Sequence, residues 1–118
     1  MIFRLFILYL LFNATAYATD VKVGGDAQTD ACASLGKIKQ KTVLYQSPAL
    51  DAQRIKNLLP DQQAYICSVS ADRKWFGVVL QNAGANCGVS SPKAKRSAYR
   101  GPCASGWVQS KAIEHVAG

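Results

Sequence analysis

The chain has 118 residues and a formal net charge of +7, with 49% hydrophobic and 18% charged residues. This length excludes more than one ordinary domain, and this apolar content excludes a disordered chain. We therefore expect one small folded domain with a basic surface.

The first 18 residues have the pattern of an export signal. Arg4 is followed by eight apolar residues, and the segment ends in Ala16-Tyr17-Ala18, a small-x-small pattern at which signal peptidase cleaves. Because a membrane-spanning helix needs about 20 apolar residues, we expect cleavage after Ala18 and no stable membrane insertion. Cleavage removes one of the 14 basic residues and none of the seven acidic ones, so the mature chain has a net charge of +6. Its expected location is periplasmic or secreted.

The predicted mature chain contains four cysteines, Cys32, Cys67, Cys87 and Cys103. An even number in an exported chain predicts two disulfides. The segment between Cys87 and Cys103 is rich in turn residues and charge, so a disulfide between them would tie the ends of a loop and contribute about 3 kcal/mol to stability. Cys32 then pairs with Cys67 by elimination. Metal binding is not expected, because zinc ligands usually come in closely spaced pairs and His115 is the only histidine.

The N-terminal part of the mature chain carries no clear element. Residues 19–31 contain Gly24-Gly25 and show no apolar period, and we expect them to form a flexible arm. Order is expected to begin near Cys32, so the folded domain would comprise residues 32–118.

Further along, short β-branched and aromatic segments alternate with turn residues, which predicts strands. The expected strands are 42–45, 62–70, 75–80 and 106–109, followed by a terminal turn over 111–116. Residues 49–59 allow two interpretations, a helix capped by Ser47-Pro48 or a strand over 54–58. Short strands at close spacing favour a small antiparallel barrel.

Four segments in order resemble the bacterial SH3-like (SH3b) domain over residues 41–114. They are Val43-Leu44-Tyr45-Gln46-Ser47-Pro48, Ile55-Lys56-Asn57-Leu58-Leu59-Pro60-Asp61-Gln62, Trp75-Phe76-Gly77-Val78 and Gly106-Trp107-Val108-Gln109-Ser110. The resemblance implies an all-β, SH3-like antiparallel barrel, with a strand over 54–58. This chain departs from a typical member in the long segment, closed by two cysteines, that precedes the last Gly-Trp-Val strand.

No residue pattern in the sequence predicts catalysis. There is no Gly-x-Ser-x-Gly motif, and the acidic residues mostly lie in the expected arm and turns. His115 stands near the C-terminus beside Glu114 and is expected to be a solvated side chain without a catalytic partner. We therefore expect a protein that is not an enzyme and that carries no cofactor.

The candidate binding residues form two groups. The first is a cluster of cations around an aromatic residue on the cysteine-closed loop, which could hold an anionic polymer or an acidic protein face: Lys93, Lys95, Arg96, Tyr99 and Arg100. The second group, Trp75 and Tyr45, could line a shallow groove of the kind that some members of the resembling family have. Trp107 is expected in the core.

Together these features predict a non-catalytic binding module of the bacterial cell envelope. The resemblance implies peptidoglycan as one partner, and an envelope protein is the other. An alternative function is inhibition of a cell-wall hydrolase. Nucleic acid is not an expected partner, because an exported chain would not meet it.

The mature protein is expected to begin at Thr19, because the predicted cleavage site follows an apolar segment that is too short to remain as an anchor. Intact mass spectrometry of the exported protein tests this. A membrane-associated product that keeps residues 1–18 would contradict it.

Overall fold

The computed structural model describes residues 18–118, so most of the predicted export signal lies outside the described residues. The described chain is all-β, with one short 3-10 helix. Its elements are β1 (Lys22–Val23), β2 (Asp26–Asp30), β3 (Ser34–Ile38), β4 (Thr42–Tyr45), β5 (Arg54–Leu58), β6 (Gln63–Val69), β7 (Trp75–Leu80), β8 (Pro92–Lys93), β9 (Ser97–Ala98), β10 (Ser105–Gln109), η1 (Ser110–Ala112) and β11 (Ile113–Ala117).

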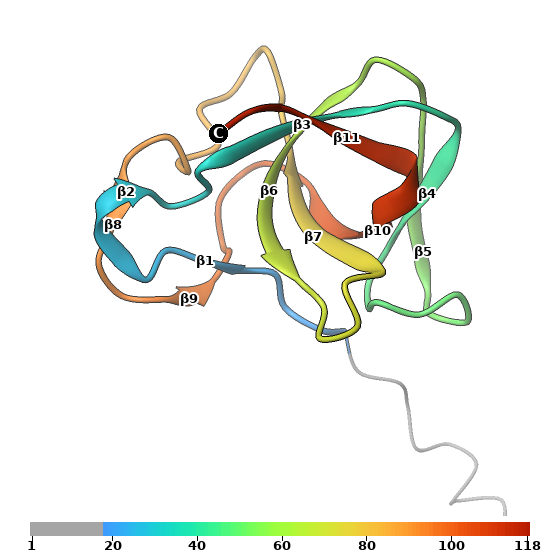
Figure 1. The fold of residues 1–118 in the computed structure, drawn as a ribbon, viewed down its shortest axis with the longest axis horizontal. Helices are drawn as coiled ribbons and strands as arrows, with labels where there is room; N and C mark the ends of the chain where they lie inside the picture. The colour runs from blue at the N-terminus through green and yellow to red at the C-terminus, as the bar shows by residue number, and fades with distance from the viewer. Residues whose placement is uncertain (1–17) are drawn as a thin grey trace, which may run out of the picture.

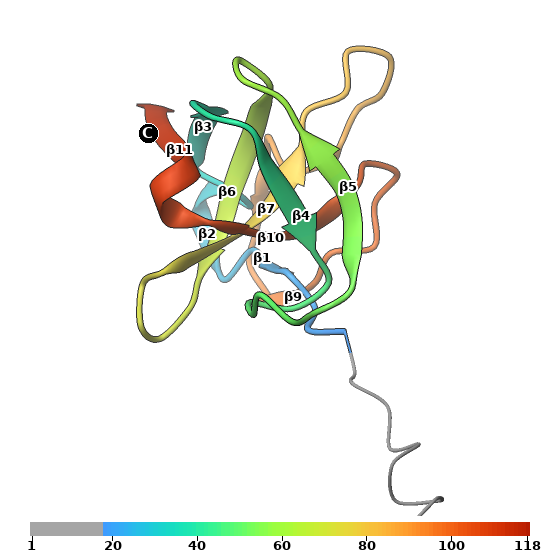
Figure 2. The same cartoon turned by 90° about the vertical axis from the view of Figure 1, so that its right-hand side faces the viewer.

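Seven strands form one antiparallel sheet in the order β11-β3-β6-β7-β10-β4-β5. The sheet curls strongly on itself (Figure 2), and every one of its strands contributes a buried side chain to a single main core. The largest fully buried members of this core include Ile38, Leu44, Leu58, Val78 and Val108. The sheet is nevertheless open, because no ladder joins β5 to β11 among the described strands. The expected closed barrel is therefore not formed by strand pairing.

Most of the predicted strands are confirmed. β4, β6, β7 and β10 lie where the sequence predicts them, and β5 decides the ambiguity of residues 49–59 in favour of a strand. The terminal turn predicted over 111–116 is wrong beyond η1, because β11 pairs with β3 along the edge of the main sheet.

The prediction of a flexible arm over residues 19–31 is also wrong. Val21 and Val23 are only 3% and 4% exposed, and β1 and β2 pair with β9 and β8 respectively. Figure 1 shows these four short strands together on one side of the main sheet. A two-residue strand has too few side chains to give an alternating pattern, and β2 is exposed along its whole length, so the sequence carries little local signal for either.

Residues 19–31 are called here the N-terminal segment, and residues 88–102 are called the tied loop. These two segments enclose a second core. It combines side chains from both segments with Val79 of β7 and both disulfides. The pairs are Cys32–Cys67 and Cys87–Cys103, which confirms the predicted connectivity. The first pair fixes the N-terminal segment to β6, and the second closes the tied loop.

Gly106 of β10 provides a test of the contact between β10 and the β4–β5 hairpin. A Cβ atom on Gly106 would lie 2.6 Å from the Tyr45 carbonyl oxygen and 2.9 Å from Ile55 Cδ1. Because backbone cannot move aside cheaply, Gly106→Ala is expected to reduce the free energy of unfolding by about 1–3 kcal/mol. Urea unfolding measures this.

Gly84→Ala is the matched control, since the nearest atom to its new Cβ would be Asn82 Oδ1 at 3.7 Å. We expect a change within about 0.5 kcal/mol. Equal effects of the two substitutions would contradict the close packing at Gly106.

Candidate functional site

The tied loop is held along its length rather than at its ends alone. β8 and β9 pair with β2 and β1, and the Gly25 amide donates a hydrogen bond to the Lys93 carbonyl at 2.9 Å. The loop is therefore part of the second core, and its side chains are presented from a fixed backbone.

Tyr99, predicted as a binding residue, is instead buried, with 9% exposure. Its hydroxyl donates to the Cys87 carbonyl at 2.7 Å and accepts a hydrogen bond from the Cys103 amide at 3.2 Å. These bonds connect both ends of the tied loop beside the disulfide. Tyr99 therefore stabilises the loop and presents little surface to a partner.

The predicted aromatic groove is likewise not open. Trp75 and Tyr45 are 7% and 5% exposed and meet edge to face, with ring centroids 5.5 Å apart. Both belong to a third buried cluster together with Trp107, whose predicted core position is confirmed. These aromatic side chains fill space between the sheet and the N-terminal segment.

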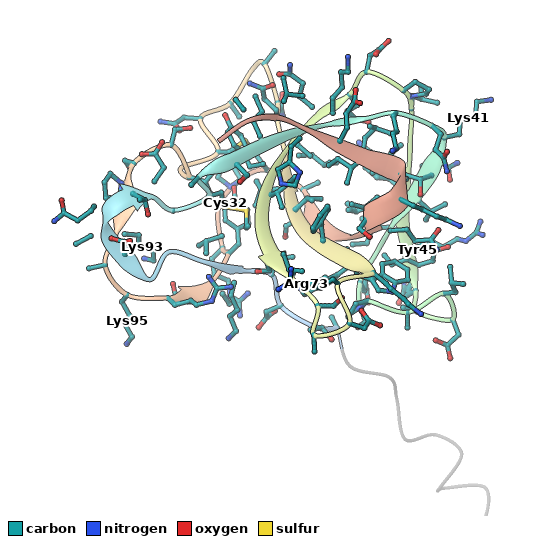
Figure 3. All side chains as sticks on the ribbon, in the orientation of Figure 1. Cys32, Lys41, Tyr45, Arg73, Lys93 and Lys95 are labelled. Atoms are coloured by element: carbon teal, nitrogen blue, oxygen red, sulfur yellow. A yellow bond between two sulfur atoms is a disulfide. The ribbon has the colours of Figure 1, made fainter. Side chains whose placement is uncertain are left out.

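The four cations of the tied loop are exposed, but the structure separates them. Figure 3 places Lys93 and Lys95 at the end of the molecule where β2 and β8 pair. Arg100 forms an ion pair with Asp20, with Nη2 3.3 Å from Oδ2. Arg96 donates from Nη1 to the Gly24 carbonyl and from Nη2 to Ser68 Oγ, each at 3.2 Å.

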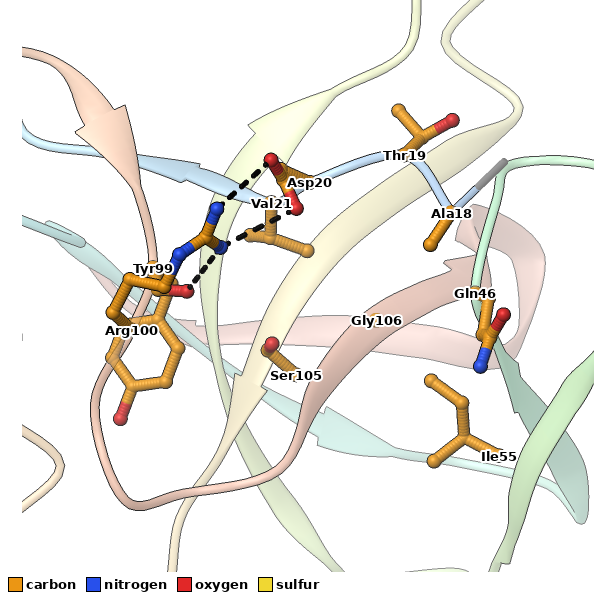
Figure 4. A pocket seen from close by; sticks show the side chains of 10 residues that line it. All are labelled: Ala18, Thr19, Asp20, Val21, Gln46, Ile55, Tyr99, Arg100, Ser105 and Gly106. Carbon is orange, nitrogen blue, oxygen red and sulfur yellow. Dashed lines mark hydrogen bonds and ion pairs between the residues drawn. The ribbon is translucent and has the colours of Figure 1, made fainter.

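Figure 4 shows the pocket beside the Asp20–Arg100 pair, which has a volume of about 210 Å³. Its other walls include Thr19, Gln46 and Ile55. Because the carboxylate of Asp20 already neutralises Arg100, this pocket has a weaker attraction for an anion than the cation count suggests.

A larger groove, about 570 Å³, lies where β6, β7 and β11 meet the tied loop. We call it the basic groove. Three basic side chains and no carboxylate stand among the described residues that line it, which are Ser34, Ile66, Cys67, Ser68, Val69, Arg73, Phe76, Arg96 and His115. Of the four cations predicted on the loop, Arg96 is the one that lines this groove.

Arg73 reaches the groove from the β6–β7 hairpin. Its backbone has a φ of 62°, and its carbonyl accepts a hydrogen bond from the Ser110 hydroxyl at 3.0 Å. Asp72 organises the turn by accepting hydrogen bonds from the Ser70 hydroxyl at 2.6 Å and the Lys74 amide at 2.9 Å. These two bonds hold the pKa of the Asp72 carboxyl below its usual value. Arg73 lies between the predicted strands 62–70 and 75–80, and nothing in the sequence indicates that it faces a groove.

His115 is exposed, as expected, but it also forms a wall of the basic groove. β11 places its ring edge to face with Phe76 of β7, with centroids 5.7 Å apart. The sequence interpretation missed this position because it assigned β11 to a terminal turn. A ring pair beside two guanidinium groups offers an apolar contact next to positive charge.

Ser68 joins the groove to the second core and was not predicted as a site residue. It is 7% exposed, and its hydroxyl donates to the Lys22 carbonyl at 2.8 Å while accepting from the Lys22 amide and from Arg96. The register of β6 against β7 shifts between Ile66 and Ser68. Such an irregularity changes the direction in which the side chains of a strand point, and here it accompanies a polar contact that orients Arg96.

A scan of protein-family models and searches of curated proteins and of solved structures gave no match to this chain. Within residues 18–118, no helix is long and apolar enough to cross a membrane. The same residues contain no cluster of three or more His, Cys, Asp or Glu side chains that could hold a metal ion.

The role of Tyr99 can be tested through stability. Tyr99→Phe removes a hydroxyl that satisfies two buried backbone groups, so we expect the free energy of unfolding to fall by about 1–3 kcal/mol. Denaturant unfolding of the oxidised protein measures the change. Tyr65→Phe, at a half-buried tyrosine packed against the same core, should change it by less than about 0.5 kcal/mol. A Tyr99→Phe protein of unchanged stability would contradict the structural role.

Proposed function

We propose that this protein is an exported, non-catalytic binding module of the cell envelope with an SH3-like domain. The basic groove carries the proposal, because it brings Arg73, Arg96 and His115 together around an aromatic surface with no lining carboxylate. Such a groove suits a carboxylate group attached to a short apolar stem. Peptidoglycan stem peptides and acidic protein segments both offer this chemistry.

Two further observations support the extracytoplasmic part of the proposal. Both disulfides lie in the folded domain, and disulfides of this kind persist in oxidising compartments. Residues 1–18 also have the sequence pattern of an export signal.

Cosedimentation with purified sacculi, beside capture from an envelope-protein extract, distinguishes the two partner classes. Arg73→Ala should weaken binding to the partner roughly tenfold, the effect of losing about 1.4 kcal/mol. The affinity should also become less sensitive to salt, because one exposed cation has been removed.

Arg54→Ala is the matched control, since it removes an equal charge from β5, outside the residues that line the basic groove. It should leave binding within about twofold of the parent. Equal losses from the two substitutions would show that net charge, and not the groove, attracts the partner. Binding to neither sacculi nor envelope proteins would contradict the proposed function.

A further inference from the structure

Within residues 18–118, the first backbone contact with the domain is made by Thr19. The Thr19 amide donates to the Gln46 carbonyl at 3.0 Å and to Ser47 Oγ at 3.1 Å. Both acceptors lie in the turn that follows β4. The hydroxyl of Thr19 also contacts Ser47 Oγ at 3.1 Å.

The carbonyl group of Thr19 is also hydrogen-bonded. It accepts a hydrogen bond of 2.8 Å from Nε1 of Trp107, whose side chain is 5% exposed. A buried indole N–H needs an acceptor, so Thr19 completes the polar requirement of this core residue. Two residues later, Val21 is buried beside the same tryptophan.

The same residue is the predicted first residue of the mature chain. Cleavage after Ala18 would replace the Thr19 amide with a free ammonium group, which has three N–H donors in place of one. We propose that the turn after β4 is a binding site for the chain's own α-ammonium group, with the Gln46 carbonyl and Ser47 Oγ as its acceptors. The inference rests on the proposed export and cleavage.

The surroundings suit a cation at this point. Hydrogen bonds from a charged donor are roughly twice as strong as those from an amide. The third N–H would take the place of the peptide bond to Ala18. It would therefore lie along the pocket shown in Figure 4, which Ala18 lines. Arg100, the other cation of this pocket, is paired with Asp20 and so repels the ammonium group less than a lone guanidinium would.

This site would distinguish the correct N-terminus from neighbouring ones. A chain that begins at Ala18 keeps an uncharged amide at Thr19. A chain that begins at Asp20 loses the donor, the Thr19 hydroxyl and the acceptor of the Trp107 indole together. Cleavage after Ala18 therefore yields the end group that makes the most of the existing contacts.

The first test measures the reactivity of the terminal amine. Oxidised protein with Thr19 as its first residue is treated with acetic anhydride, and mass spectrometry follows acetylation of the α-amine in folded and guanidinium-unfolded chains. The folded α-amine should react at least tenfold more slowly, whereas the exposed Lys93 should react at similar rates in both states.

Ser47→Ala should raise the rate of α-amine acetylation in the folded protein toward the unfolded value. Ser91→Ala, which alters an exposed serine of the tied loop, should leave the rate unchanged. An α-amine that reacts equally fast in the folded and unfolded parent would overturn the proposal.

The second test compares chains that begin at Ala18, Thr19 and Asp20 by thermal unfolding. The Thr19 chain should have the highest Tm, and the Asp20 chain should unfold about 4–8 °C lower, the shift produced by roughly 1 kcal/mol in a domain of this size. Equal Tm values for the three chains would overturn the proposal. Neither test involves the basic groove, so a protein with a protected amine that binds no envelope component refutes the proposed function alone.

Discussion

The disulfide between Cys32 and Cys67 holds the second core of this protein on its main sheet. Its two Cα atoms are 4.6 Å apart, which brings the end of the N-terminal segment directly against β6. β1 contributes one buried side chain, Val23, and β2 contributes none, so these two strands add little apolar burial to the attachment. Once this segment is fixed, it offers backbone partners to β8 and β9, and the tied loop gains an ordered path. The second disulfide and Tyr99 then close that loop from within.

The same arrangement determines the shape and charge of the basic groove. Ser68 lies under the N-terminal segment and binds both Lys22 and Arg96, so the contact that secures β1 also directs one guanidinium group of the groove. A second guanidinium group comes from the β6–β7 hairpin, and the imidazole comes from the edge strand β11. The tied loop, the β6–β7 hairpin and β11 are separate in the sequence, and strand pairing brings them together. The groove therefore depends on the main sheet and on the second core together.

The number of cations on the tied loop overstates the positive charge that is available to a partner. Arg100 is neutralised by Asp20, a residue that the sequence interpretation had placed in a flexible arm. Lys93 and Lys95 lie at the β2–β8 end of the molecule, away from Arg73 (Figure 3). What distinguishes Arg96 from its neighbours is its bond to a buried serine, which holds the cation where it lines a cavity. Local composition shows where cations are concentrated in the sequence. The groups with which they pair determine how much of the positive electrostatic field remains available to a partner.

The residue pattern was enough to predict the all-β class and the positions of β4, β6, β7 and β10, because alternating apolar residues and turn formers are properties of neighbouring residues. Loop closure predicted the Cys87–Cys103 pair and left Cys32–Cys67 by elimination, whereas β5 remained one of two interpretations until the resemblance favoured a strand. The sequence also located Arg96 as a candidate, although among four similar cations. The tertiary structure alone decided that residues 19–31 are paired, that Tyr99, Trp75 and Tyr45 are buried, and that Arg73 and His115 share a groove. These outcomes depend on contacts between segments dozens of residues apart. A short strand with no alternation of its own acquires its conformation from the backbone that it pairs with, and that partner is known only when the chain has folded.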